Sequence, residues 1–164
     1  MRFVKLGLIS IVGLFIVIFA ISLLIPGEIR VSRAVNIIAP KDSIHDRLAD
    51  LRHWKQWNAL TNVAGVLNQQ YAANTITSDE LTVKLREARA DSITTTWQQK
   101  EGRTIESGFN LHTVDNTTVV QWYFDFHLKW YPWEKFGSII FDKQLGPPME
   151  QSLAELKKLL EQAP

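Results

Sequence analysis

The stretch TTVVQWYFDFHLKW, residues 117–130, has side chains that alternate strictly between two faces. One face holds large apolar side chains, namely Val120, Trp122, Phe124, Phe126, Leu128 and Trp130. The other face holds Gln121, Tyr123, Asp125, His127 and Lys129. A period of two predicts a β-strand with one buried face. Because that face is dominated by aromatic rings, a packed helix, or a helix and a ligand, must cover it.

Length, cysteine content and charge limit the class of protein. The 164 residues suit one domain and are short for two. No cysteine is present, which excludes disulfides, thiolate metal sites and thiol nucleophiles. The net charge is +1 and no basic block occurs, so nucleic acid is not expected as a partner.

The amino terminus carries a long apolar run from Leu6 to Ile25 that contains no charged residue. At about 1.5 Å per residue, a helix of this length spans roughly 30 Å, the thickness of a bilayer core. The run predicts an uncleaved single-pass anchor. A cleaved signal peptide is the alternative, but its apolar region is usually about 7–15 residues long, and ISLLIPGE at residues 21–28 offers no good cleavage site.

The flanks of this run predict its orientation and its end. Arg2 and Lys5 precede it, whereas Arg30 and Arg33 follow it at a greater distance. This small asymmetry places the amino end inside and the rest on the translocated side, periplasmic or extracellular. Pro26-Gly27 ends the helix. We therefore expect an anchor and short link over residues 1–27 and a folded domain over residues 28–164.

The folded part begins with a predicted strand over Ile29–Ile38 and a helix over Ser43–Leu51, which Asp42 or Ser43 can cap. A short helical turn should then carry Trp54 and Trp57 on one side. Core packing is the favoured role of this tryptophan pair, and the wall of a pocket is the alternative. Residues 61–78 show no clear pattern.

Three further strands should precede the opening stretch, over Glu80–Arg86, Ser92–Gln99 and Arg103–Thr113. Lys100-Glu101-Gly102 predicts one hairpin connection, and Asp115-Asn116 predicts the next tight turn because both residues tolerate a positive φ. Sequential strands joined by short turns predict an antiparallel meander with one apolar face.

The carboxyl-terminal part is predicted to be helical. Pro132 should start a short amphipathic helix that serves as a lid or core helix, or, as the alternative, lies against a bilayer. Gly146-Pro147-Pro148 should interrupt the helix. After this interruption, residues 149–161 form a three-turn amphipathic helix with the apolar positions Met149, Leu153, Leu156, Leu159 and Leu160. The order of elements predicts an α+β fold.

Residues 30–161 resemble the START-like helix-grip superfamily of polyketide cyclase/dehydrase and lipid-transport type. The resemblance rests on VSRAVNIIAPKDSIHDRLADLRHWKQW at residues 31–57 and on LGPPMEQSLAELKKLLE at residues 145–161. It implies a curved antiparallel sheet wrapped around a long carboxyl-terminal helix. It also implies a cavity between sheet and helix that holds a lipid or another apolar small molecule.

The residues expected to line that cavity are apolar and mostly aromatic: Trp54, Trp57, Trp97, Phe109, Trp122, Phe124, Phe126, Met149 and Leu153. Thr95, Ser107 and Thr113 are its few expected polar groups, which suit ligand orientation better than proton transfer. The four histidines lack the spacing of a zinc site, and no cofactor is expected.

Three functions stay open at this stage. The favoured one is a membrane-anchored module that binds an apolar ligand, and the others are a cyclase/dehydrase-type enzyme and a structural module with a filled core. Asp125 and His127 would offer acid–base chemistry if they approached His112, but on an outer sheet face a solvated cross-strand pair is favoured. Ligand identity and oligomeric state carry no signal in the sequence.

Overall fold

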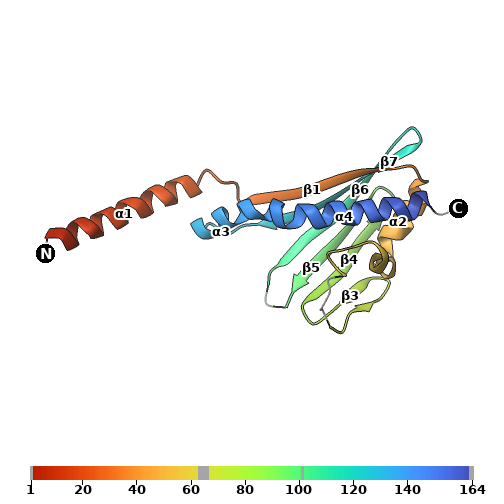
Figure 1. Cartoon of the computed structure of the whole chain (residues 1–164), viewed down its shortest axis with the longest axis horizontal. Coiled ribbons are helices and arrows are strands. Elements are labelled where there is room, and N and C mark those ends of the chain that lie inside the picture. Colours follow the sequence, from red (N-terminus) through yellow and green to blue (C-terminus); the bar gives the residue numbers. More distant parts are fainter. Residues whose placement is uncertain (1, 63–66, 101, 163–164) are drawn as a thin grey trace.

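The computed structural model describes residues 2–62, 67–100 and 102–162, and shows one sheet, a long helix on its face and a helix projecting from one end (Figure 1). The strands are β1 Glu28–Ile37, β2 Gln70–Tyr71, β3 Thr75–Thr77, β4 Leu81–Arg89, β5 Ser92–Gln99, β6 Thr104–Val114 and β7 Thr117–His127. The helices are α1 Arg2–Ser22, α2 Lys41–Ala49, α3 Pro132–Gly137 and α4 Phe141–Glu161, with 3-10 turns η1 Leu51–Gln56 and η2 Ser138–Ile140.

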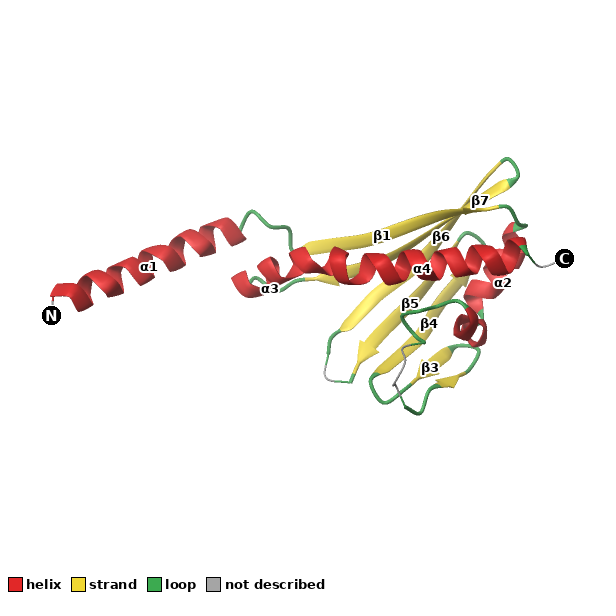
Figure 2. Cartoon of the chain, viewed as in Figure 1, coloured by secondary structure: helices red, strands yellow, loops and turns green. Residues whose placement is uncertain are grey.

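The sheet is antiparallel and curved, with seven strands in the order β1-β7-β6-β5-β4-β3-β2. The first strand, β1, pairs with the last, β7, and forms one edge. Figure 2 shows α4 lying along the sheet, where it contacts β1. The predicted α+β helix-grip fold is therefore confirmed.

In strand β7 the predicted alternation of buried and less buried side chains is confirmed, but the strand is shorter than expected. Trp122 is fully buried and Phe124 is 3% exposed. The strand ends at His127, because the chain turns there and the Leu128 amide donates to the Gly27 carbonyl at 2.7 Å. Trp130 therefore lies off the sheet and is 63% exposed, so its predicted place on the inward face is wrong.

The turn signals before β7 are confirmed in part. Asp115 adopts φ 53° at the tight turn between β6 and β7, as predicted. Strands β5 and β6 form the expected hairpin, with Gln98 opposite Thr104, although Glu101 of their connection lies outside the described residues. Between residues 61 and 78, β2 and β3 complete the far edge of the sheet, and residues 63–66 lie outside the described part.

Helix α2 begins earlier than predicted, at Lys41, and its N-cap position is occupied by Pro40 without a side-chain hydrogen bond. The predicted capping by Asp42 or Ser43 is thus wrong. The helix is held instead by packing, because Ile44 and Leu48 are fully buried.

Helix α4 is continuous through Pro147 and Pro148, so the predicted interruption is wrong. Contacts with other parts of the fold compensate for the two prolines. The guanidinium of Arg33 in β1 binds Asp142 at 2.9 Å and Glu150 at 2.6 Å, one on each side of the proline pair. Buried Met149, Leu153 and Leu156 fix the rest of the helix on the sheet. These contacts offset the backbone hydrogen bonds that the prolines cannot donate.

Helix α1 projects from the domain and carries an exposed apolar surface (Figure 1). Its segment Phe3–Ser22 has a mean hydropathy of 2.7 and is long and apolar enough to cross a membrane. The short helix α3 lies beside the carboxyl end of α1. Its predicted role as a core helix is wrong, since Trp133 and Phe136 are 66% and 36% exposed.

Candidate functional site

The centre of the grip is filled by aromatic side chains. Neighbouring rings of this aromatic cluster lie 5.1–6.3 Å apart between centroids. Its members are Trp54, Trp57, Trp97, Phe109, Trp122 and Phe124, none more than 5% exposed. Such spacing is that of packed aromatic pairs, so this part of the inner face is core.

Most polar atoms of the cluster are engaged within the protein. The indole N–H of Trp122 donates to Ser107 Oγ at 2.9 Å, and that of Trp97 donates to Thr95 Oγ1 at 3.1 Å. Thr95 and Ser107 thus satisfy buried indoles and are not free to orient a ligand. Thr113, the third predicted polar lining residue, is exposed near the β6–β7 turn.

A hollow of about 490 Å³ lies beyond the cluster, at the end of the grip nearest to α1 and α3. We call it the open-end hollow. Its apolar lining comprises Leu60, Leu81, Trp97, Ile105, Phe124, Phe126, Leu128, Phe141 and Leu145. Its polar lining comprises Gln99, Arg103, Thr104, Asp125, His127 and Gln144. Volume and lining match those of ligand pockets, which are about 300–1,000 Å³ and mostly apolar.

The first turns of α4 and the last residues of β7 form part of the wall of the open-end hollow. The rings of Phe126 and Phe141 pack together with centroids 4.6 Å apart. Beyond Phe124 the aromatic contacts continue more loosely, since the ring of Phe126 lies 6.4 Å from that of Phe124 between centroids. The hollow lies beside these contacts and is lined by the half-buried rings of Phe126 and Phe141.

An ion pair at the rim joins the hollow to α3. Arg103 Nη1 lies 2.9 Å from Glu134 Oε2, which also accepts a hydrogen bond from the Lys129 amide at 2.9 Å. The hydrogen bond from Arg103 is the main cause that lowers the pKa of Glu134 to about 2 from an ordinary value of 4.5. The carboxylate thereby links the start of β6, the end of β7 and α3.

The outer face of β7 does not assemble the suspected acid–base group. In the β6–β7 register, His112 lies opposite Val119 and Asp125 lies opposite Glu106, so the expected approach to His112 is wrong. Asp125 instead accepts two hydrogen bonds from Arg30, at 2.6 and 2.7 Å. The favoured interpretation, a solvated cross-strand pair, is confirmed for Asp125.

The structure separates the nine predicted ligand-binding residues into three groups. Trp97, Phe124 and Phe126 line the open-end hollow. Leu153 lines a different groove. The others are buried in the core: Trp54, Trp57, Phe109, Trp122 and Met149. Ligand binding by these residues stays a prediction.

Several lining residues were missed at the sequence level. Leu81 in β4 and Ile105 in β6 are two of them, and the alternation of each strand places them on the same face as the buried Val83 and Phe109. Phe141 and Leu145 were missed because the helix was expected to begin at Met149.

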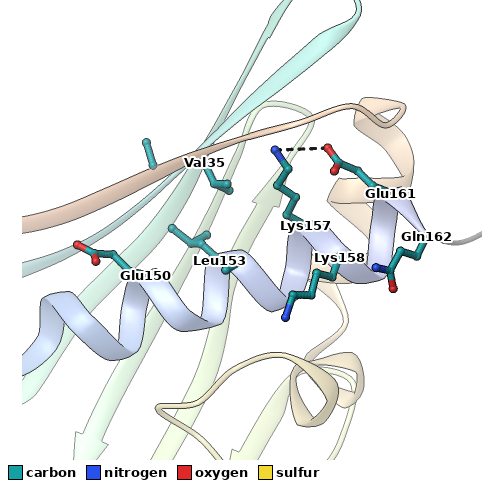
Figure 3. A pocket seen from close by; sticks show the side chains of 9 residues that line it. Val35, Glu150, Leu153, Lys157, Lys158, Glu161 and Gln162 are labelled. Atoms are coloured by element: carbon teal, nitrogen blue, oxygen red, sulfur yellow. Dashed lines mark ion pairs between the residues drawn. The ribbon is translucent and has the colours of Figure 1, made fainter.

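A second depression, of about 400 Å³, lies between β1 and the carboxyl-terminal half of α4 (Figure 3). Val35 and Leu153 form its floor, and Lys157 pairs with Glu161 at 3.7 Å on its side. No aromatic residue is among those that line it, whereas the open-end hollow has four. The open-end hollow is thus the stronger candidate. Among the described residues, no three His, Asp or Glu side chains are grouped to hold a metal ion.

A curved antiparallel sheet that grips a long carboxyl-terminal helix, with a hollow between them, defines the START-like class of folds. The sequence profile of the polyketide cyclase / dehydrase and lipid transport family matches residues 28–161, and the chain belongs to that family.

Solved structures share this fold at low sequence identity. A START superfamily protein from Mycobacterium smegmatis has a TM-score of 0.58 at 20% identity, covering 81% of this chain and 97% of that one. CalU16 from Micromonospora echinospora has a TM-score of 0.57 at 12% identity, with 84% of each chain covered. DynU16, of the dynemicin biosynthetic locus, has a TM-score of 0.56 at 17% identity over 80% of this chain, which spans only 47% of DynU16. No curated protein matches.

Proposed function

We propose that this protein is a membrane-anchored START-like domain that binds a lipid or another apolar small molecule in the open-end hollow. The observation that carries the proposal is the hollow of about 490 Å³ between sheet and α4, with aromatic rings from both walls. Burial of an apolar ligand there removes from water the surface of the ligand and the remaining accessible surface of the half-buried Phe126 and Phe141 rings. The description of the family as including lipid transport supports the same class of ligand.

Binding is favoured over a reaction because charged groups of the lining have partners. Asp125 is held by Arg30, and Arg103 is held by Glu134. A cyclase/dehydrase-type enzyme would need a titratable group placed over the ligand's reacting atoms. His127 is the remaining titratable residue of the lining, and it lies 65% exposed beside Glu28. It is poorly sheltered for acid–base work on an enclosed ligand.

The anchor is the second part of the proposal. Residues 1–27 would hold α1 in the bilayer and link it to the folded domain of residues 28–164. The apolar side chains of α1 support this, since exposure of such a helix to water is unfavourable. The amino end would stay inside and the domain would face the translocated side, periplasmic or extracellular.

Mass spectrometry of molecules that co-purify with the detergent-extracted full chain tests the binding proposal. Leu145→Trp places a large ring in the open-end hollow, and Leu159→Trp adds the same ring at a half-buried site near the other end of α4. Both variants keep α1, so lipids that merely adhere to the anchor are common to both.

The expected result is an apolar species that is retained by the wild type and by Leu159→Trp but lost from Leu145→Trp. Identical profiles for all three proteins would contradict binding in the open-end hollow. A filled structural core, the remaining alternative, predicts that outcome.

A further inference from the structure

Helix α3, turn η2 and Trp130, which lies two residues before α3, expose a set of large apolar side chains. We call this set the α3 patch: Trp130, Trp133, Phe136, Ile139 and Ile140, with exposed fractions of 63%, 66%, 36%, 63% and 51%. Single exposed apolar residues are normal, but a contiguous group of large ones marks a surface that contacts something apolar. The core of the domain does not use these side chains.

The α3 patch continues directly from the apolar surface of α1. The Lys135 ammonium donates to the Ile25 carbonyl at 2.8 Å, just beyond the carboxyl end of α1. The ring of Trp130 lies edge-on to Phe19 of α1, with centroids 6.3 Å apart. Figure 2 shows α3 at the junction between α1 and the domain. A bilayer that contains α1 therefore has its surface at the level of the α3 patch.

The composition around the patch is that of a membrane–water interface. Tyr131 stacks on Trp133 with centroids 4.8 Å apart and also packs against Trp130 at 4.7 Å. Tryptophan and tyrosine prefer this layer because an apolar ring is joined to one polar group. Lys129, exposed beside them, suits the headgroups. This continuity with α1 favours a lipid surface as the occupant over a protein partner.

The mouth of the open-end hollow lies at the same end. Glu134 of α3 binds Arg103 on its rim, and Phe141, which directly follows η2, forms part of its wall. Contact between the α3 patch and a bilayer would place this mouth at the lipid surface.

We propose that the α3 patch inserts into the headgroup layer of the bilayer that α1 spans, so that an apolar ligand passes between that leaflet and the open-end hollow without crossing water. The inference rests on the proposed anchor and on the proposed ligand class. Its physical advantage is that the apolar surface of the ligand stays covered during transfer.

The absence of cysteine allows a direct test on the full chain. Single cysteines are introduced as Trp133→Cys and Ile139→Cys in the patch, as Leu14→Cys in α1, and as Val114→Cys at the distant β6–β7 turn. Val114 is the matched control because it is apolar and 60% exposed. Each protein is labelled with an environment-sensitive fluorophore and reconstituted in phosphatidylcholine vesicles that carry spin-labelled quencher lipids.

The expected result is quenching at positions 133 and 139 by lipids with a shallow spin label, quenching at position 14 by a deep label, and none at position 114. If position 14 were quenched while positions 133 and 139 were as exposed to solvent as position 114, the inference would be overturned. The proposed anchor would still be supported. Fluorophores at 133 and 139 that are shielded from water but not quenched would show that protein, such as a second copy of this chain, covers the patch, which also overturns the inference. No quenching at 14 would instead refute the anchor.

Transfer provides a second readout, with a fluorescent fatty acid supplied in vesicles as the probe. Trp133→Asp combined with Ile139→Asp should slow its transfer into the hollow several-fold, because the two carboxylates replace apolar side chains that would be buried at the boundary between headgroups and acyl chains. Val114→Asp should not change the rate. Binding of the same probe at equilibrium should be unaffected in all three proteins. An equal rate in the double variant and the wild type would contradict transfer through the patch, whereas absent probe binding in every protein would refute the proposed function for this ligand.

Discussion

Gly108 in β6 makes room for a stack of side chains on the outer face of the sheet. A Cβ at this position would lie 2.6 Å from the Tyr123 hydroxyl and 2.7 Å from the Ile93 carbonyl oxygen. The Tyr123 ring therefore lies close to the backbone, with the Arg30 guanidinium 4.3 Å from its centroid. Arg30 in turn holds Asp125. The absence of a Cβ at Gly108 thus leaves space for the Tyr123 ring, against which Arg30 packs while it pairs with Asp125.

Replacement of Gly108 should test this dependence. Gly108→Ala is expected to lower the free energy of unfolding by about 1–3 kcal/mol, because the carbonyl oxygen that meets the new methyl group belongs to the backbone and cannot move aside cheaply. Gly137→Ala is the control, since nothing lies within 4 Å of a Cβ there and the residue is helical. Denaturant titration of the two detergent-solubilised variants measures the difference. Equal midpoints would show that the outer stack can rearrange without cost.

At the scale of the element, strands were more predictable than helix ends. Strand β5 has the predicted bounds, Ser92–Gln99, because alternation along a meander strand is a local property of the sequence. The start of α4 was missed because Pro147 and Pro148 disfavour a helix locally. What overrides them is Arg33, a residue of β1 that is distant in sequence. Helix propensity is a local property of the sequence and contains no information about such a long-range contact.

The link between α3 and the rim of the hollow has a defined pH dependence. The pKa of Glu134 is about 2 in the folded protein and 4.5 ordinarily, so the charged form is favoured by folding. The stabilisation from this carboxylate is complete above pH 4.5 and is lost as the pH falls toward 2. Carboxyl chemical shifts of the carbon-13-labelled protein should titrate with a midpoint of about 2 at Glu134.

Arg103→Met provides the matched comparison for this titration. Loss of the guanidinium should move the midpoint of Glu134 upward, toward its ordinary value, while the Lys129 amide bond remains. Asp50, whose pKa is also lowered to about 2 by a hydrogen bond from Arg52, should not move. An unchanged Glu134 midpoint in Arg103→Met would mean that the ion pair does not hold α3 in solution.

For the whole molecule, the sequence predicted the apolar face but not where it is hollow. The face itself follows from alternation in β5, β6 and β7. Whether it is filled depends on how Trp54 and Trp57, carried on and just after η1, dock against Phe109 and Trp122. Those two indoles fill the centre and leave the end near α1 open. Side-chain docking across elements decides this, and spacing along the chain does not encode it.

The orientation of the whole protein in the membrane should depend on a margin of one positive charge between the two flanks of the apolar run. Three positive groups precede the apolar run, namely the terminal amine, Arg2 and Lys5, and two follow within a few residues, Arg30 and Arg33. The flank with the greater positive charge is retained inside. In a full chain with Val114→Cys, a membrane-impermeant maleimide added to intact cells should therefore label the domain from outside.

Arg2→Gln combined with Lys5→Gln reverses this margin, and labelling of intact cells should fall, with full labelling restored on permeabilisation. Arg30→Gln widens the margin and should leave labelling as in the wild type. Arg30 is suitable because its side chain is 55% exposed and lies outside the core. If the wild type were labelled only after permeabilisation, the domain would face the inside. The α3 patch would then meet the opposite leaflet, and a ligand would have to be drawn from there.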